Sequence, residues 1–435
     1  MQKPDKSLSR DRARSASKGI SIMTVKVCFA AACVLGLSVV GSGLDAQVSA
    51  PLVQSNNLVR LGSFKVPTGL HVGSGDAELE YGGTALGFNP ARNSLFITGH
   101  DWDQLNEEIS IPTLGGTATR LQSLTDPFEG HVDDIGASGN KTGGHFVYNG
   151  KLYVTAYTYY DASFSQKRSH FVRPVDLSVK GQIAGPYSVG PLNPGFYSGY
   201  MTVIPSAWRA ALGGPVITGN CCLSIITRTS LGPAAFVIDP ETLGTSAAIP
   251  LVYYNADHPT LGVYSSDGIN PAYNRATQIT GVVFPEGTST VLFFGSTGLG
   301  ESCYGEGTNN QALHHTPVPG YPDVQYCYDP VGAGGKGDHG YPYASYIWAY
   351  DARDFAAVKA GTKQPWQVTP YTTWTLPLSD TGYNRLGGAT YDPATNRIYV
   401  SQLRGDEARP LIQVYTVSNA TTTPPQAPTN VRIIR

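Results

Sequence analysis

The stretch "GGTALGFNPARNSLFITG", residues 82–99, contains a strand rich in small residues, a turn and a second apolar strand. Its turn, "NPARN", has the Asn and Pro chemistry of a tight turn, and short apolar runs flank it. Four further copies of this unit follow: "GGHFVYNGKLYVTAY" (143–157), "GYMTVIPSAWRAALGGPVITG" (199–219), "ITGVVFPEGTSTVLFFG" (279–295) and "GGATYDPATNRIYVSQ" (387–402). Repetition of this kind indicates a repeat architecture, which decides the fold.

Each unit is followed by a third strand, and four of the five units also have a fourth. The third strands start at residues 108, 170, 235, 347 and 412, and the fourth strands occupy 117–124, 185–190, 246–254 and 366–376. The fifth unit lacks a fourth strand, which "LVRLGSFKV" (58–66) would supply from the other end of the chain. Ring closure of this kind removes exposed strand edges. We therefore predict an all-β fold, a β-propeller of five blades closed by an N-terminal strand, although the length also suits six or seven blades.

The composition agrees with many short strands joined by turns. The chain has 50 Gly, 31 Pro and 26 Tyr, and only 14% of its residues are charged. Only two helices are expected, at "PSAWRAALGG" (205–214) and "DARDFAAVKAG" (351–361), each about two turns long.

The ends of the chain predict export from the cytoplasm. Residues 1–46 have a basic segment, a short apolar run and an Ala-rich site, which is typical of a signal peptide; a membrane anchor would need a longer apolar run. A linker (47–57) and the propeller domain (58–417, with a long loop insertion at 296–342) follow. Residues 418–435 are a Thr/Pro-rich linker and a stub that resembles the start of a fibronectin type III module. We expect a secreted protein, extracellular or periplasmic, without a membrane segment after cleavage.

The charge balance excludes some partners. Seven of the 30 Lys and Arg and three of the 32 Asp and Glu lie in residues 1–46, which leaves 23 basic and 29 acidic residues. A mildly acidic chain without a basic run is a poor ligand for nucleic acid. The chain also contains no Gly-x-Ser-x-Gly, phosphate-loop or His-Glu-x-x-His motif.

The loops divide into two sets according to the end of the propeller at which they should lie. Loops between second and third strands, together with the connections between repeats, share one end. That end collects "GHDWDQLNEE", "YTYYDASFSQKR", "GNCCLS", "LRGDEARP" and connections such as "FEGHVDDIGASGN". The opposite end has short turns. Because loops on a rigid scaffold are where sites are usually built, we expect the site at the mouth of the central channel.

Acidic residues on this face are the catalytic candidates. Converging carboxylates would either bind Ca²⁺ or divide acid and base roles, and the sequence establishes no cofactor. The alternative is that they bond loop backbone or carry solvated charge. The candidates are Asp101, Asp103, Asp133, Asp134 and Glu80, with Glu78 beside the last.

Aromatic and basic residues of the same face are the ligand-binding candidates. Rings with one polar tip suit the alternating apolar and hydroxyl faces of sugars, and they suit packing between repeats equally well. The candidates are Trp102, Tyr197, Tyr200, Tyr383, Arg385 and His131. A metal site at His314 and His315 is not favoured, because no metal-ligand spacing repeats there.

Four cysteines remain after the signal peptide. Cys221–Cys222 with Cys303–Cys327 is the favoured pairing, in which a strained ring of adjacent cysteines forms a rigid platform on the loop-rich face. The alternative sends Cys221 and Cys222 separately to Cys303 and Cys327 and pins the long insertion to the third repeat.

Two functional hypotheses follow. The predicted fold resembles that of the five-bladed carbohydrate-active enzymes, and this resemblance implies a secreted glycoside hydrolase with paired carboxylates at the channel mouth. The alternative is a non-catalytic propeller that binds a glycan or a protein through the same face. A glycan or polysaccharide is the expected partner in the first case, and a cell-surface or matrix partner is also expected in the second. Adjacent cysteines also occur in quinone-dependent sugar dehydrogenases, a third reading that nothing else in the sequence supports.

Overall fold

The computed structural model describes residues 50–69, 78–221, 228–255, 272–378 and 385–418. The predicted signal peptide and the fibronectin-like stub lie outside these ranges. Within the described residues, most elements are short strands, and no helix has the length and apolar character needed to cross a bilayer.

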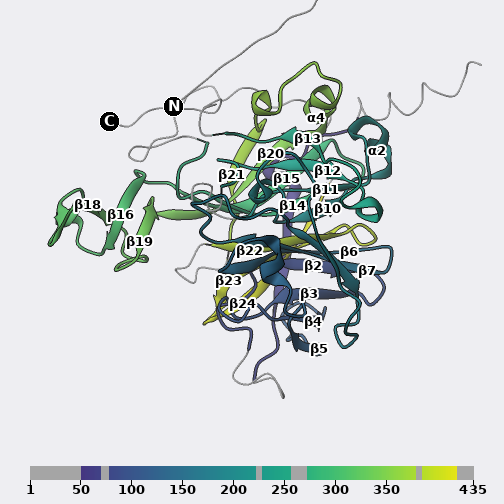
Figure 1. Cartoon of the computed structure of the whole chain (residues 1–435), viewed down its shortest axis with the longest axis horizontal. Helices are drawn as coiled ribbons and strands as arrows, with labels where there is room; N and C mark the ends of the chain where they lie inside the picture. Colours follow the sequence, from purple (N-terminus) through teal and green to yellow (C-terminus); the bar gives the residue numbers. More distant parts are fainter. Residues whose placement is uncertain (1–49, 70–77, 222–227, 256–271, 379–384, 419–435) are drawn as a thin grey trace, which may run out of the picture. The chain divides into compact units, whose positions relative to one another are not determined.

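Outside the sheet formed by residues 303–339, the described strands form five four-stranded antiparallel units, here called blades 1 to 5 (Figure 1). Blade 1 contains β2 (Leu86–Asn89), β3 (Ser94–Thr98), β4 (Asn106–Ser110) and β5 (Arg120–Thr125). Blade 2 contains β6 (Asn140–Tyr148), β7 (Lys151–Thr158), β8 (His170–Pro174) and β9 (Ala184–Tyr187). Blade 3 contains β10 (Met201–Val203), β11 (Val216–Thr218), β12 (Ala235–Ile238) and β13 (Ile249–Val252).

The last two blades include the start of the described chain. Blade 4 contains β14 (Gln278–Val283), β15 (Thr290–Gly298), β20 (Tyr343–Asp351) and β21 (Thr372–Thr375). Blade 5 contains β22 (Leu386–Asp392), β23 (Arg397–Asp406), β24 (Arg409–Val417) and β1 (Leu58–Lys65), and β1 runs antiparallel to β24. A parallel bridge between β14 and β22 joins blades 4 and 5 into one eight-stranded sheet.

The first strands of the blades lie around a common centre. β2 contacts β6 and β22, β10 contacts β6 and β14, and β14 pairs with β22. This radial arrangement is that of a β-propeller. The fold class predicted from the repeats is confirmed.

Glycine allows the first strands to approach one another this closely. A Cβ atom on Gly143 of β6 would lie 1.8 Å from the carbonyl oxygen of Ser198 in the connection to blade 3. A Cβ atom on Gly387 of β22 would lie 1.9 Å from the carbonyl oxygen of Gly83. The Gly-Gly pairs that open several repeats therefore have a packing reason in the ring.

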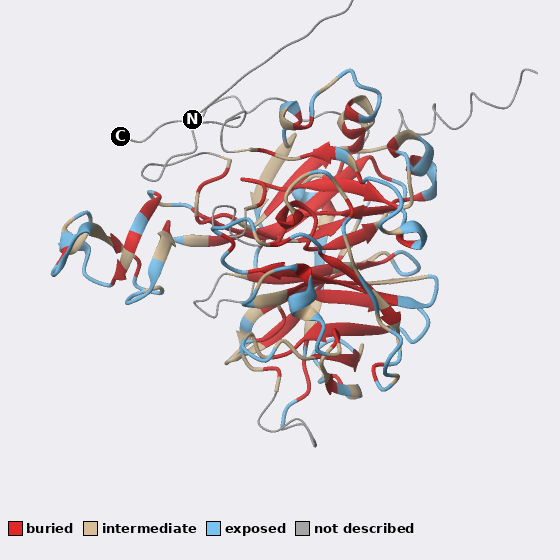
Figure 2. Ribbon diagram, in the orientation of Figure 1, coloured by how far each residue is buried: buried red, intermediate tan, exposed pale blue. Residues whose placement is uncertain are grey.

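The apolar core is divided among the interfaces between blades. The described residues form five buried clusters, and each cluster joins two neighbouring blades. Phe96 and Phe171, for example, join blades 1 and 2, and Tyr200 and Trp348 join blades 3 and 4. Figure 2 shows buried residues concentrated along the strands and exposed residues in the loops. Burial between blades thus holds the ring rigid, and the loops at its two ends are free to vary.

Two short helices occur where the sequence predicts them. They are α2 (Ser206–Leu212) and α4 (Ala352–Lys359). Asp351 caps α4 by accepting a hydrogen bond from the backbone N–H of Arg353. Both helices connect strands of the blades and do not build the centre of the ring.

The insertion at 296–342, predicted as a long loop, is instead a small sheet in the order β17-β18-β16-β19. Its strands are β16 (Cys303–Thr308), β17 (Pro317–Val318), β18 (Tyr321–Tyr328) and β19 (Lys336–His339), and they extend away from the blades in Figure 1. The Cys303–Cys327 disulfide, with its Cα atoms 5.7 Å apart, links β16 to β18. Strand pairing was missed here because the insertion has little of the apolar alternation that marks the blades.

Candidate functional site

A pocket of about 550 Å³ lies where the first strands of four blades begin. It is lined by Tyr81, Gly82, Thr84, His100, Asp101, Trp102, Lys141, Thr142, Tyr157, Tyr159, Cys221, Gln278, Thr280, Arg385, Leu386, Gly387, Leu403 and Arg404. These residues belong to first strands, to the ends of second strands (Tyr157, Leu403 and Arg404), to connections between blades or to the segments between second and third strands. This is the loop-rich end that the sequence singles out.

The loop between β3 and β4 contributes an acidic and an aromatic side chain. Backbone N–H groups of Asp103 and Gln104 donate to the carbonyl oxygen of His100 at 3.1 and 3.0 Å, which folds the loop into a turn. The turn leaves the Trp102 side chain 87% exposed at the pocket. Asp101 lies next to it and is bound by the ammonium group of Lys141 from β6. The loop therefore presents an open apolar ring beside a neutralised carboxylate.

Tyrosines form further walls of the pocket. Tyr81 precedes β2 in the left-handed backbone region (φ 55°) and is half exposed, with its ring 5.5 Å from that of His100. Tyr159 follows β7 and is 46% exposed, and the Lys141 ammonium lies 5.2 Å from its ring centroid. These rings offer flat apolar surfaces with hydroxyl groups, the chemistry that suits a sugar ring.

Two arginines of blade 5 complete the pocket. The guanidinium of Arg385, just before β22, lies 4.5 Å from the ring centroid of Tyr343, and that of Arg404 in β23 lies 5.8 Å from the ring of Tyr81. The backbone N–H of Leu403 donates to the carbonyl oxygen of Arg385 at 3.0 Å, which joins the two arginine-bearing segments. A cation–π contact orients each guanidinium over its aromatic neighbour.

Cys221 lines the pocket and is disulfide-bonded. Its partner lies outside the described residues, because Cys303 and Cys327 pair with each other. That pairing excludes the alternative in which Cys221 and Cys222 bind Cys303 and Cys327. The predicted Cys221–Cys222 bond includes Cys222, which lies outside the described residues.

Glu78 and Glu80 form an acidic pair just before Tyr81 and Gly82 of the pocket lining. Arg409 donates to Glu80 at 2.7 Å and lies 3.7 Å from Glu78. Burial and the neighbouring Glu80 raise the pKa of the Glu78 carboxyl, and Arg409 opposes this shift. The carbonyl oxygen of Glu78 accepts a hydrogen bond from the N–H of His100 at 3.0 Å, which ties the pair to the pocket loop.

The other acidic candidates are dispersed. Asp133 and Asp134 lie in a short 3₁₀-helix (Val132–Ile135), where Asp133 accepts a hydrogen bond from Asn140 at 2.7 Å and Asp134 pairs with His131 at 2.9 Å. All three candidates in this segment are absent from the pocket lining. Asp103 points along its own loop, 4.0 Å from His100. The expected convergence of these carboxylates with Asp101 is not found among the described residues.

Two predicted ligand-binding tyrosines are core residues. The Tyr197 hydroxyl donates to the carbonyl oxygen of Leu192 at 2.8 Å, and the Tyr200 hydroxyl donates to Asn220 at 2.6 Å and to Ala234 at 2.8 Å. Burial raises the pKa of both phenols. Both hydroxyl groups are therefore bound within the core between blades, and the prediction that Tyr197 and Tyr200 bind a ligand is corrected. Tyr383 lies outside the described residues.

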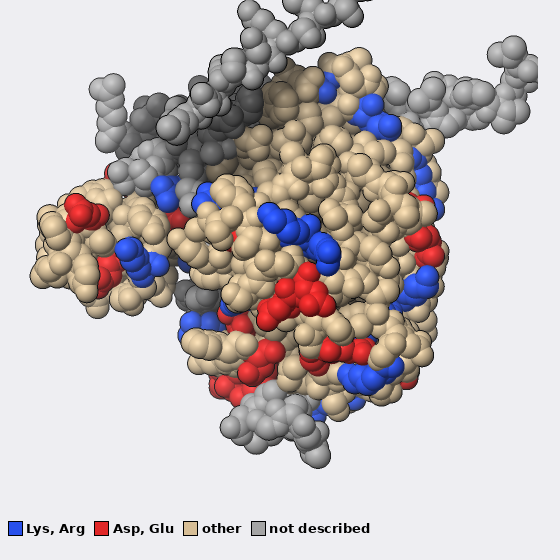
Figure 3. All heavy atoms as spheres, in the orientation of Figure 1, with Lys and Arg blue, Asp and Glu red and all other residues tan. Residues whose placement is uncertain are grey.

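Several pocket residues have no distinctive signal in the sequence. Lys141, Tyr159 and Arg404 each lie at the end of a strand, and neither charge nor spacing marks them. Placement at the loop-rich end was the only available signal, and it applies to many residues. Only 14% of the residues are charged, and charged side chains occupy a minority of the face seen in Figure 3. A charged residue at the loop-rich end is therefore an uncommon feature.

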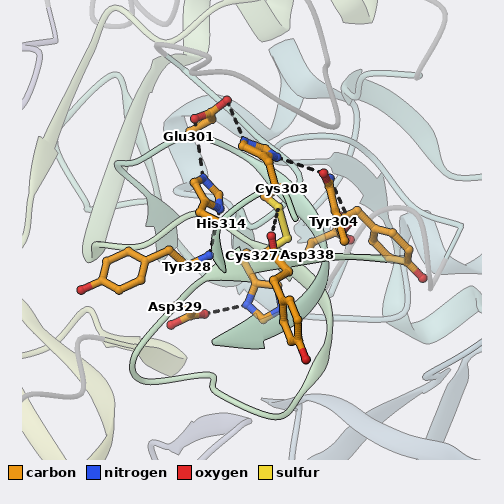
Figure 4. Close-up of a disulfide and its surroundings, with 12 residues drawn as sticks. Glu301, Cys303, Tyr304, His314, Cys327, Tyr328, Asp329 and Asp338 are labelled. Carbon is orange, nitrogen blue, oxygen red and sulfur yellow. Dashed lines mark hydrogen bonds and ion pairs between the residues drawn. A yellow bond between two sulfur atoms is a disulfide. The ribbon is translucent and has the colours of Figure 1, made fainter. Parts of the chain in front are cut away.

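A histidine pair lies apart from the pocket, in the insertion. His314 Nε2 and His315 Nε2 lie 3.7 and 3.4 Å from the carboxylate oxygens of Glu301, beside the Cys303–Cys327 disulfide (Figure 4). The sulfur of Cys303 is oxidised in the disulfide, so it is a poor metal ligand. His314 Nδ1 accepts a hydrogen bond from the N–H of Tyr328, which leaves the proton of a neutral ring on Nε2, the atom that faces Glu301. This tautomer disfavours a metal between the three side chains.

No family model and no curated protein matches the chain. Among solved structures, a native arabinanase from Bacillus subtilis is similar at 11% identity and a TM-score of 0.40, over 78% of this chain and 94% of the other. A glycosyl hydrolase from Bacteroides ovatus is similar at 10% identity and a TM-score of 0.39, over 88% and 94%. A GH43 endo-arabinanase from Bacillus licheniformis is similar at 12% identity and a TM-score of 0.36, over 76% and 91%. At this level of similarity, the functional argument has to come from the pocket itself.

Proposed function

We propose that the protein is secreted and binds carbohydrate in the pocket at the channel mouth. The observation that carries the proposal is the Trp102 side chain, 87% exposed at the edge of a pocket of about 550 Å³. An indole that faces water offers a flat apolar surface, and sugars stack on such rings through their apolar faces. Pockets of this size suit a small saccharide unit.

The neighbouring side chains support a sugar as the ligand. Tyr81 and Tyr159 add two partly exposed rings with hydroxyl groups. Gln278 and Thr280 of β14 add neutral donors and acceptors on the opposite side of the ring of first strands. Together they provide the mixture of flat apolar surface and hydrogen-bonding groups that a sugar requires.

A glycan array with the mature wild-type protein tests this proposal. We expect binding to a defined group of glycans and weaker binding to the same glycans in Trp102→Ala. Tyr321→Ala is the matched control, because Tyr321 is an aromatic residue that is 67% exposed on β18 and does not line the pocket. Equal binding by all three proteins, or no binding by the wild type, contradicts the proposal.

Glycoside hydrolysis is the second candidate function, and one observation favours it. Asp101 lies in the pocket, and the nearby Glu78 has a raised pKa, as a general acid requires. Against it, Asp101 is the one carboxylate that the described residues place in the pocket lining, and Lys141 is bound to it. A depolymerisation assay with and without Ca²⁺ decides: release of reducing ends that disappears in Asp101→Asn and Glu78→Gln, and persists in Asp133→Asn, establishes the hydrolase.

A further inference from the structure

Exposed aromatic side chains of the blades gather at one end of the propeller. Outside the insertion, the described residues expose five Phe, Tyr or Trp side chains, and all five belong to the loops and connections of the loop-rich end. They are Tyr81, Trp102, Tyr159, Tyr160 and Phe164. Single exposed rings are common on protein surfaces, but a group of them in one place marks a binding surface.

Three of these rings line the pocket, and the other two lie beyond its lining. Tyr81, Trp102 and Tyr159 belong to the lining, whereas Tyr160 and Phe164 do not. Tyr160 is 69% exposed and Phe164 is 52% exposed, and both lie in the segment between β7 and β8 that begins at Tyr159. This segment therefore continues the aromatic surface past the wall of the pocket.

Hydrogen bonds within the segment hold it in one conformation. The buried carboxylate of Asp161 accepts hydrogen bonds from the N–H and the hydroxyl of Ser165 at 2.6 and 2.7 Å. The Phe164 N–H donates to the carbonyl oxygen of Asp161 at 3.1 Å, and Phe164 adopts the left-handed backbone region (φ 55°). This conformation is uncommon for a residue with a side chain, and the surrounding hydrogen bonds maintain it.

Blade 3 supports the same segment through Arg228, which lies between β11 and β12. The Arg228 guanidinium donates to the carbonyl oxygens of Asp161 and Ala162 at 3.2 and 3.1 Å. It also lies 4.5 Å from the centroid of the Phe164 ring, a cation–π contact that leaves about half of the Phe164 side chain exposed. A ring held in this way loses little conformational entropy when a ligand covers it.

We infer that the ligand is an extended glycan whose units continue from the pocket over Tyr160 and Phe164. The inference rests on the proposed carbohydrate binding and deepens it, because it assigns a binding surface outside the pocket and an oligomeric ligand. One sugar unit lies in the pocket against Trp102, and the following units stack through their apolar faces on the two rings beyond it. A short saccharide that fills only the pocket leaves both of these rings uncovered.

Titration calorimetry with oligosaccharides of two lengths tests the inference. The probes are linear glucans, xylans, mannans and arabinans and any further class that the glycan array selects, each as the dimer and as the octamer. We expect the octamer of the bound class to bind about tenfold more tightly than the dimer, because each additional stacked ring strengthens binding by about two- to tenfold.

Variants separate the aromatic surface from the larger number of sugar units in a longer chain. Tyr160→Ala and Phe164→Ala should each lower the ratio of octamer affinity to dimer affinity by about two- to tenfold. Trp102→Ala should weaken the binding of both lengths and keep their ratio. Tyr321→Ala is the matched control, because this exposed aromatic residue of β18 lies in the insertion, and its ratio should equal that of the wild type.

The outcomes distinguish this inference from the proposed function. Equal affinity of dimer and octamer in the wild type, or the same ratio in the wild type, Tyr160→Ala and Phe164→Ala, overturns the extended surface and leaves carbohydrate binding in the pocket intact. Absence of binding to every probe and to the glycan array overturns the proposed function itself, and the inference falls with it.

Discussion

Asp101 and Lys141 form an ion pair across two blades: the carboxylate comes from the loop after β3 of blade 1, and the ammonium comes from β6 of blade 2. The pair joins neighbouring blades at the edge of the pocket. It also neutralises the one carboxylate that the described residues place in the pocket lining. A carboxylate held in this way is poorly suited to act alone as a nucleophile or base.

Replacement of Asp101 tests what the pair does. Asp101→Asn removes the negative charge and breaks the ion pair that joins blades 1 and 2, so the free energy of unfolding should fall by about 0.5 to 1 kcal/mol. Chemical denaturation of wild type, Asp101→Asn and the control Asp133→Asn measures this change. Equal stability of wild type and Asp101→Asn would show that the pair does not hold the two blades together.

Trp102 should affect binding and not stability. Because its indole faces water, Trp102→Ala should weaken glycan binding by about two- to tenfold and change the free energy of unfolding by less than about 0.5 kcal/mol. Titration and chemical denaturation give the two values. A large loss of stability would mean that the indole packs against the protein in solution, and its role as a binding surface would then be refuted.

Crowding at the centre of the ring predicts that alanine substitution at two glycines has very different effects on stability. Gly143→Ala places a Cβ atom 1.8 Å from the Ser198 carbonyl oxygen and should destabilise the fold by more than about 2 kcal/mol. Gly337→Ala in β19 has no atom within 4 Å of the added Cβ and should be tolerated. Denaturation midpoints of the two variants measure this difference, and equal midpoints would contradict the packing described for β6.

Two buried histidines predict loss of stability in acid. Burial lowers the pKa of His145 and of His170 from 6.5 to about 3 in the folded protein. Between these values the unfolded chain takes up protons that the folded protein does not. Stability therefore falls as the pH drops from about 6.5 towards 3, by up to about 1.4 kcal/mol per pH unit for each ring.

The variant His145→Asn isolates this effect, because Glu107 acts in the opposite direction. Burial raises the pKa of Glu107 to about 7, so its contribution to stability falls as the pH rises from about 4.5 to 7. Denaturation of wild type and His145→Asn at pH 7 and pH 5 gives the difference. The variant should lose less stability in acid than the wild type, and parallel curves would refute the assignment of a neutral buried His145.

The disulfide should stabilise the insertion without supporting the pocket. Cys303 and Cys327 are 24 residues apart, so the bond contributes about 3 kcal/mol by restricting the unfolded chain. Replacement of both by Ser should raise hydrogen exchange in residues 299–342 and leave glycan affinity unchanged. Reduced affinity in this variant would show that the insertion supports the pocket.

Regular repetition made the architecture predictable from the sequence. Strand, turn and strand recur with Gly at the start and apolar residues facing the interfaces, so the all-β propeller class and both helices could be expected. The insertion could not, because β16 to β19 lack that pattern and depend on a disulfide and on their own pairing.

The site was predictable as a place and only in part as a set of residues. Asp101, Trp102 and Arg385 lie in the pocket as candidates of the loop-rich end, and so does Cys221. Tyr197 and Tyr200 also lie in a connection between blades, but their side chains turn into the core. There, backbone carbonyl oxygens and Asn220 accept hydrogen bonds from the two hydroxyl groups. Which way a side chain turns depends on contacts between blades, and no local pattern encodes those contacts.

Hydroxyl-radical footprinting of the wild-type protein with and without its array-selected glycan tests the central claim most directly. The account predicts that the glycan protects Trp102, Tyr81 and Tyr159 from oxidation and leaves Tyr321 of the insertion unprotected. Protection of Tyr321, with Trp102 oxidised as fast as in the free protein, would contradict carbohydrate binding at the channel mouth.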